Sequence, residues 1–128
     1  LKNKINDLHW KSIKHLTKNY KTVFIGNMSV KSIIKKGSNL SKINKRVANS
    51  YEFFKFHQRL EYKCMLNDVQ LYVIDESYTS KTCSVCGWYN IDLNIKKIYD
   101  CQNCKLKIDR DINGCRGICI KSGQVACH

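Results

Sequence analysis

The first 19 residues place apolar side chains at helical spacing, with lysines between them. The stripe consists of Leu1, Ile5, Leu8, Ser12, Ile13 and Leu16. This pattern predicts an amphipathic helix. The apolar run that follows, residues 22–25 (TVFI), ends at Gly26 and predicts a short buried strand.

Three further segments complete the pattern. Residues 47–66 carry two apolar stripes and predict a second helix that is buried on more than one side. One stripe is Phe53, Phe56, Leu60 and Cys64, and the other is Val47, Tyr51 and Phe54. Residues 69–75 (VQLYVID) are apolar on both faces, which is typical of a central strand covered on both sides. Residues 111–121 predict a final helix, although Gly114 and Gly117 lower its helix propensity. The order helix, strand, loop, helix, strand, cysteine-rich segment, helix predicts an α/β fold.

Residues 31–46 (KSIIKKGSNLSKINKR) are basic and poor in large apolar side chains. We expect an exposed loop that becomes ordered on a phosphate backbone, and an ordinary solvated loop is the open alternative. Its candidate nucleic-acid contacts are Lys31, Lys35, Lys36, Lys42, Lys45 and Arg46. The formal net charge of +13 favours an anionic partner. A membrane surface is also anionic, but no run of about 18 apolar residues is present that could span a bilayer.

Four of the eight cysteines form two Cys-x-x-Cys pairs: Cys83, Cys86, Cys101 and Cys104. Each pair can aim two thiolates at one ion, and four soft ligands suit tetrahedral zinc. Such a closed site predicts structural zinc. Disulfides or redox-active thiols are the alternatives, whereas persistent free thiols predict an intracellular protein of the cytoplasm or nucleus. We expect the remaining cysteines to be small buried residues or part of a frayed tail, and Trp88 and Tyr89 either to pack the ribbon core or to stack on a base.

Carboxylates are scarce, and two groups stand at element ends. Asp75 and Glu76 follow the second strand, and Asp109 and Asp111 begin the final helix. Together they could hold a divalent metal for phosphodiester hydrolysis. They could equally cap the helix or pair with lysines.

Three segments together resemble the C-terminal signature of TnpB proteins, the OrfB-type transposon proteins related to Fanzor proteins and type V CRISPR effectors. They are residues 76–87 (ESYTSKTCSVCG), 99–104 (YDCQNC) and 109–113 (DRDIN), with a weaker likeness over most of the upstream chain. The resemblance implies a partial RNase H-like (RuvC-type) domain with an inserted four-cysteine zinc ribbon. It also implies a Mg²⁺-dependent DNA endonuclease guided by RNA and linked to transposition.

By position, the four paired cysteines match the family's zinc ligands, and Asp111 matches its last catalytic aspartate. Asp109 is then expected to be a neighbour of the catalytic site and not a metal ligand. The family usually places a catalytic Glu where this chain has Gly26 and Asn27. Fanzor-type relatives move that Glu to the position of Glu76, which becomes the candidate here. The family's first catalytic Asp belongs to an N-terminal strand that this chain lacks.

Residue 1 is a leucine, so we expect an N-terminal portion of the polypeptide to be missing. The expected division is residues 1–78 (nuclease core), 79–108 (zinc ribbon) and 109–128 (final helix and tail). Three hypotheses follow: the distal part of a nuclease that cannot cut DNA alone, a catalytically dead nucleic-acid-binding module, or a fragment that does neither. DNA, guide RNA and the missing N-terminal portion are the expected partners, with no membrane.

Overall fold

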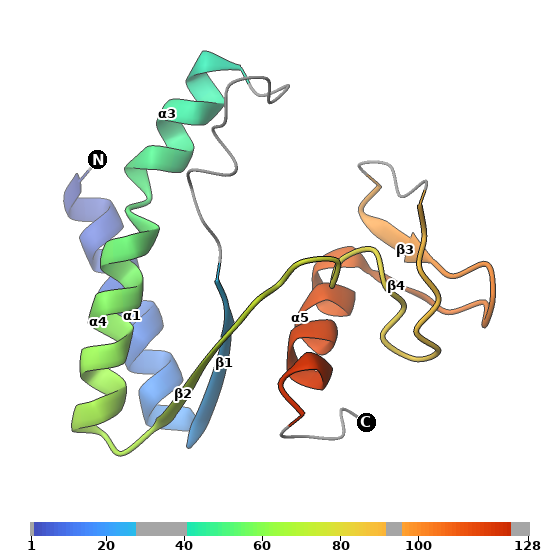
Figure 1. Ribbon diagram of the computed structural model, residues 1–128. Helices are drawn as coiled ribbons and strands as arrows, with labels where there is room; N and C mark the ends of the chain where they lie inside the picture. Colours follow the sequence, from blue (N-terminus) through green and yellow to red (C-terminus); the bar gives the residue numbers. More distant parts are fainter. Residues whose placement is uncertain (1, 28–40, 92–95, 124–128) are drawn as a thin grey trace. The chain divides into compact units, whose positions relative to one another are not determined.

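The structure is a computed structural model, and it describes residues 2–27, 41–91 and 96–123. Its elements are α1 (Lys2–Asn19), β1 (Thr22–Gly26), α3 (Lys42–Ser50), α4 (Phe53–Leu66), β2 (Gln70–Ile74), β3 (Ile98–Asp100), β4 (Lys107–Asp109) and α5 (Arg110–Lys121) (Figure 1). By internal contacts the chain divides into two units. No helix in this described part is both long enough and apolar enough to cross a membrane.

The first unit comprises residues 1–23 and 28–71 and contains the packed helices α1 and α4 (Figure 1). Ile5, His9 and Ile13 form the buried stripe of α1, at the i, i+4, i+8 spacing of one helix face. Leu60 and Cys64 are the buried residues of α4. Burying these side chains on a shared face holds the two helices together.

The predicted apolar stripes are partly wrong. Leu8 is 51% exposed, and the neighbouring His9 is buried instead. On the second predicted stripe of residues 47–66, Val47, Tyr51 and Phe54 are all exposed, so one side of that segment is buried, not two.

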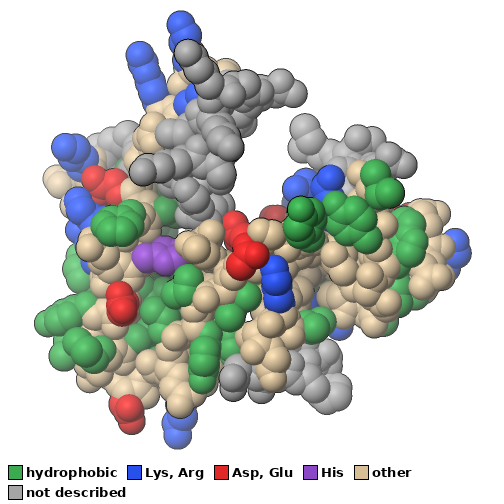
Figure 2. Space-filling model, in the orientation of Figure 1, with side chains coloured by type: hydrophobic (Ala, Val, Ile, Leu, Met, Phe, Trp, Pro, Cys, Tyr) green, Lys and Arg blue, Asp and Glu red, His purple; other side chains and the backbone are tan. Residues whose placement is uncertain are grey.

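The basic segment and the second helix also differ from expectation. Residues 42–46 belong to α3, which begins after the N-cap Ser41, whose hydroxyl accepts from the Asn44 N–H. α3 and α4 are separate helices because Glu52 adopts a left-handed conformation (φ 49°). Lys42 and Arg46 are exposed on α3 and Lys45 is half-buried, and Figure 2 shows basic side chains projecting there. Lys31, Lys35 and Lys36 lie outside the described residues.

β1 and β2 form a two-stranded sheet. Gln70 N–H donates to the Lys21 carbonyl, and Asn27 N–H donates to the Ile74 carbonyl, so the strands are parallel. The predicted double coverage of β2 is not found among the described residues, because Val73 is 51% exposed.

The second unit comprises residues 24–27 and 72–128 and contains the cysteine ribbon and α5. β3 and β4 pair antiparallel, with Tyr99 opposite Ile108. Cys83, Tyr99 and Cys101 form the buried cluster of the ribbon. Trp88 packs against this cluster, which is the core role and not the base-stacking role.

Candidate metal centre and carboxylates

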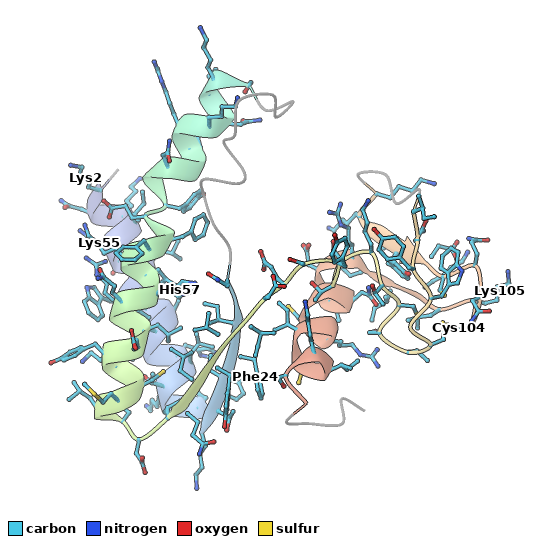
Figure 3. The ribbon with its side chains drawn as sticks, viewed as in Figure 1. Lys2, Phe24, Lys55, His57, Cys104 and Lys105 are labelled. Carbon is cyan, nitrogen blue, oxygen red and sulfur yellow. The ribbon has the colours of Figure 1, made fainter. Side chains whose placement is uncertain are left out.

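The two Cys-x-x-Cys segments adopt the same local geometry. In the first, Gly87 N–H donates to the Cys83 carbonyl at 3.0 Å, and in the second, Lys105 N–H donates to the Cys101 carbonyl at 2.9 Å. Gly87 (φ 74°) and Lys105 (φ 61°) are both left-handed. Each turn therefore curls its two sulfurs toward the same side, as a metal-binding knuckle requires. Cys104 and Lys105 are labelled at the second knuckle in Figure 3.

The four sulfurs converge. All lie within 4.8 Å of one another, with Cys83 to Cys104 and Cys86 to Cys101 both at 3.6 Å. Zinc–sulfur bonds of about 2.3 Å in a tetrahedron separate the sulfurs by about 3.8 Å, so the set fits a zinc ion. The four cysteines are free thiols in this structure and form no disulfide.

The surroundings of the cluster shift two of its thiols in opposite directions. A backbone hydrogen bond from Leu106 lowers the pKa of Cys104, but burial and the neighbouring cysteine sulfurs outweigh it and raise that pKa to about 12. Hydrogen bonds from the Asn103 side chain and the Trp88 backbone lower the pKa of the Cys86 thiol to about 6, below neutral pH. Burial raises the pKa of Tyr99 to about 12, so its hydroxyl stays protonated and donates to the Lys81 and Trp88 carbonyls, both at 3.2 Å. The centre can thus hold a cation while the neighbouring phenol pins the backbone around it.

A buried asparagine, which the pattern analysis did not single out, connects this centre to α5. Asn113 is 0% exposed; its Nδ2 donates to the Thr82 carbonyl at 2.8 Å, and its Oδ1 accepts from the Ser84 N–H at 3.0 Å. Both amide ends are thus used on the backbone of the first knuckle. Its place in the DRDIN segment was the available signal, and periodicity does not show that Asn113 is buried.

Replacing Asn113 is expected to loosen the first knuckle. Asn113→Ala leaves the Thr82 carbonyl and the Ser84 N–H without their partner, at about 1–3 kcal/mol for each buried orphan. The measurement is native-state hydrogen exchange, in which the Ser84 amide should lose protection in the variant. Lys107→Ala, which removes only an exposed ion pair with Asp100, is the matched control and should change little. Unchanged protection in Asn113→Ala would contradict this role.

The carboxylates at the two element ends have different neighbours. Asp75 binds Ser77, through N–H at 3.1 Å and hydroxyl at 2.6 Å, and pairs with Lys121 at 3.2 Å. These bonds, first those from Ser77, lower the pKa of Asp75 to about 2. Asp109 caps α5 by accepting from the N–H groups of Asp111 and Ile112. Asp75 and Asp109 therefore perform the structural roles that the sequence left open.

Glu76 and Asp111 remain after these assignments. Asp111 is exposed in the first turn of α5, and Glu76 is half-buried after β2. The Glu76 side chain lies over Gly26, where an added Cβ would clash with Oε2 and lie 3.0 Å from Cδ and 3.2 Å from Cβ of Glu76. Within the described part of the chain, the four cysteines are the group of three or more possible metal ligands, and neither carboxylate belongs to it.

The cysteines outside the cluster and Tyr89 were also considered as candidates from the sequence. Cys64 is buried, and burial raises the pKa of its thiol. Cys115 is exposed and Cys119 half-buried on α5, and neither joins the cysteine cluster. Tyr89 is 40% exposed and meets Tyr78 edge to face at 6.0 Å. Cys127 and His128 lie outside the described residues.

Comparison with known proteins agrees with this arrangement. Residues 53–118, about half of the chain, match the family model of the Cas12f1-like TNB domain. The chain is 35% identical over 117 residues to TnpB-like protein L79 of Acanthamoeba polyphaga mimivirus, covering 91% of this chain and 22% of that protein. It is 35% identical over 72 residues to TnpB-like protein MJ0751 of Methanocaldococcus jannaschii, covering 56% of this chain and 26% of that protein. A protein of Paramecium bursaria Chlorella virus 1 named as a candidate transposase is 34% identical over 116 residues, covering 88% of this chain and 25% of that protein.

A solved structure shares the fold. The Cas12f1 chain in a Cas12f1–sgRNA–target DNA complex superimposes with a TM-score of 0.66 at 24% identity, over 91% of this chain and 32% of that chain. This likeness confirms the predicted α/β class, a partial RuvC-type domain with an inserted four-cysteine ribbon. The chain spans about a quarter or less of the curated relatives that it matches. The chain therefore belongs to the family of the Cas12f1-like TNB domain and is a TnpB-type protein.

Proposed function

We propose that this chain is the C-terminal part of a TnpB-like, RNA-guided DNA endonuclease, with Glu76 and Asp111 as two of its three catalytic carboxylates. The observation that carries the proposal is the position of Glu76: its carboxyl group fills the space in which a side chain at residue 26 would begin. A carboxylate that follows β2 would thus take the place of one at the end of β1. Target DNA and guide RNA are the proposed partners, as in the named Cas12f1 complex.

The roles divide between two metals. The four cysteines would hold structural zinc, which folds the ribbon and fixes the start of α5 through Asn113. Glu76 and Asp111 would hold Mg²⁺, which when bound activates water and stabilises the leaving oxygen. Lys42, Lys45 and Arg46 on α3, with Lys31, Lys35 and Lys36, would bind the phosphate backbone.

The chain alone supplies two carboxylates, and we expect it to bind DNA without cutting it. The division into residues 1–78, 79–108 and 109–128 and an intracellular location belong to the same proposal. The free thiols of the cysteine cluster support the location, since zinc–thiolate sites persist under reducing conditions.

The test compares this chain with the full polypeptide that its reading frame encodes. Each is assayed for DNA cleavage with guide RNA and Mg²⁺, and for DNA binding over a salt series. Metal-dependent cleavage by the full polypeptide alone supports the proposal. Salt-dependent binding without cleavage by either protein would instead identify a catalytically dead binding module.

Gly26 provides a specific prediction of this arrangement. Gly26→Ala inserts a Cβ where the Glu76 carboxyl group now lies, so the carboxylate must move while the glutamate itself is retained. We expect a drop of about tenfold or more in Mg²⁺-dependent cleavage by the full polypeptide, because small displacements of catalytic groups are costly. Gly114→Ala on α5 is the control, since nothing lies within 4 Å of its Cβ position. Full activity in Gly26→Ala would show that Glu76 does not act from this position.

A further inference from the structure

A pocket of about 430 Å³ in the first unit combines an aromatic ring with several cations. It is lined by Trp10, Ile13, Lys14, Thr17 and Lys18 of α1, and by Lys63 with the adjacent Asn67 at the end of α4. This volume lies within the range of about 300–1,000 Å³ that is usual for small-ligand pockets. No acidic side chain lines it.

The cations around this pocket repel one another. Lys14 and Lys18 are one turn apart on α1, and Arg59 and Lys63 are one turn apart on α4, a like-charge spacing that destabilises a helix. Among the described residues, none of these four forms an ion pair with an Asp or Glu. Lys11 on the same helix is paired, with Asp7 at 2.8 Å. The pocket is thus a concentrated positive site that an anion would stabilise.

Trp10 lies next to two of these cations, Arg59 and Lys63. The Arg59 guanidinium carbon lies 5.1 Å from its ring centroid and the Lys63 Nζ 5.9 Å, both within cation–π range. The ring is nonetheless 41% exposed. An exposed indole beside cations is the arrangement with which proteins bind an unstacked base and its phosphate.

A buried histidine fixes the arginine. His9 is 4% exposed, and its Nε2 lies 2.8 Å from the Tyr51 carbonyl, to which it must donate. Its Nδ1 therefore accepts from Arg59 Nη1 at 3.1 Å. Arg59 is held in place before any ligand arrives, so binding loses less side-chain freedom.

The uncharged polar groups of the pocket present hydrogen-bond acceptors. The Thr17 hydroxyl donates to the Ile13 carbonyl at 2.9 Å, and the Asn67 Nδ2 donates to the Lys63 carbonyl at 2.7 Å. Thr17 Oγ1 and Asn67 Oδ1 are left as acceptors, and a phosphate cannot donate to them. A ribose 2′-hydroxyl and the amino group of a base can both donate, and of these two groups DNA lacks the hydroxyl.

From these contacts we infer that the α1–α4 pocket binds a segment of single-stranded RNA, with a base on Trp10 and phosphates on Lys14, Lys18 and Lys63. This inference rests on the proposed function for the class of partner, but it concerns a surface separate from the carboxylates.

The test measures binding of a fluorescein-labelled 12-nucleotide RNA to this chain, residues 1–128. Binding is followed by fluorescence anisotropy, without Mg²⁺ and over a salt series. Lys14→Gln with Lys63→Gln should weaken binding about tenfold or more and lower the log–log salt slope by about 1.4, the value for two phosphate contacts on a single strand. Lys4→Gln with Lys11→Gln removes the same charge from α1 outside the pocket and should change the slope little. If the two double variants lose the same RNA affinity, RNA binds by general charge attraction and not in the pocket, which would overturn the inference.

The aromatic and sugar contacts have separate tests. Trp10→Ala should weaken binding about tenfold, whereas Trp10→Phe should retain most of the affinity. DNA of the same sequence should bind several-fold more weakly than RNA, and equal affinity would overturn the assignment to RNA. A polyglutamate peptide that competes as well as RNA would point to an acidic protein and overturn it too. These experiments measure RNA binding and not DNA cleavage. Their outcome therefore tests the pocket even if the protein proves not to be a nuclease.

Discussion

Removal of zinc is expected to unfold the cysteine ribbon. Its buried cluster consists of Cys83, Tyr99 and Cys101, and two of these three are themselves proposed ligands. Structural zinc supplies about 10–16 kcal/mol of apparent binding free energy in zinc-finger peptides, comparable with or larger than the 5–15 kcal/mol that stabilises a whole domain. Without the ion, four thiols would remain around a core too small to fold.

Cys101→Ser, or chelation, should therefore abolish stoichiometric zinc and the hydrogen-exchange protection of β3 and β4. Zinc is measured by elemental analysis of reduced protein, and protection by native-state exchange. Cys115→Ser is the matched control, because Cys115 lies exposed on α5 outside the cluster, and it should retain both. A zinc-free preparation with full protection in β3 and β4 would refute the structural role.

Neutralising Glu76 or Asp111 is expected to abolish DNA cleavage by the full polypeptide. Glu76→Gln and Asp111→Asn keep the shape of each side chain and remove the charge that would hold Mg²⁺. We expect a loss of at least about 100-fold in each, since even residues behind metal ligands contribute about 10- to 100-fold. The measurement is single-turnover cleavage at saturating Mg²⁺.

The neighbouring carboxylates provide matched controls. Asp75→Asn changes a residue engaged with Ser77 and Lys121, and Asp109→Asn keeps a good N-cap for α5. Both controls should cleave at close to the original rate. If the controls lose as much activity as Glu76→Gln and Asp111→Asn, the effect belongs to the local fold and not to metal binding.

The sequence predicted the local elements well, because their signals are local. The spacing of the four cysteines was sufficient to expect their convergence, and both knuckles form within five residues each. α1, β1, β2 and α5 follow from apolar runs and periodicity, with bounds within a residue or two. The position of Asp109 at the start of the final helix allowed a metal ligand, a helix cap or a lysine partner, and the structure shows the cap.

Features that depend on tertiary contacts were not predictable in the same way. His9 replaces Leu8 in the buried stripe because its ring nitrogens find the Tyr51 carbonyl and Arg59, which no periodicity can show. The break at Glu52 requires a left-handed residue where neither glycine nor proline marks it. Asn113 acquires its role from two backbone groups about 30 positions away in the chain.

The contact between Gly26 and Glu76 has an evolutionary consequence. A side chain at residue 26 requires the Glu76 carboxyl group to move, so the two sites are epistatic. A lineage that restored glutamate at residue 26 while retaining the one at residue 76 would pass through an intermediate with two crowded, mutually repelling carboxylates. Paired substitutions avoid this crowded intermediate, which makes the location of this carboxylate a marker of descent.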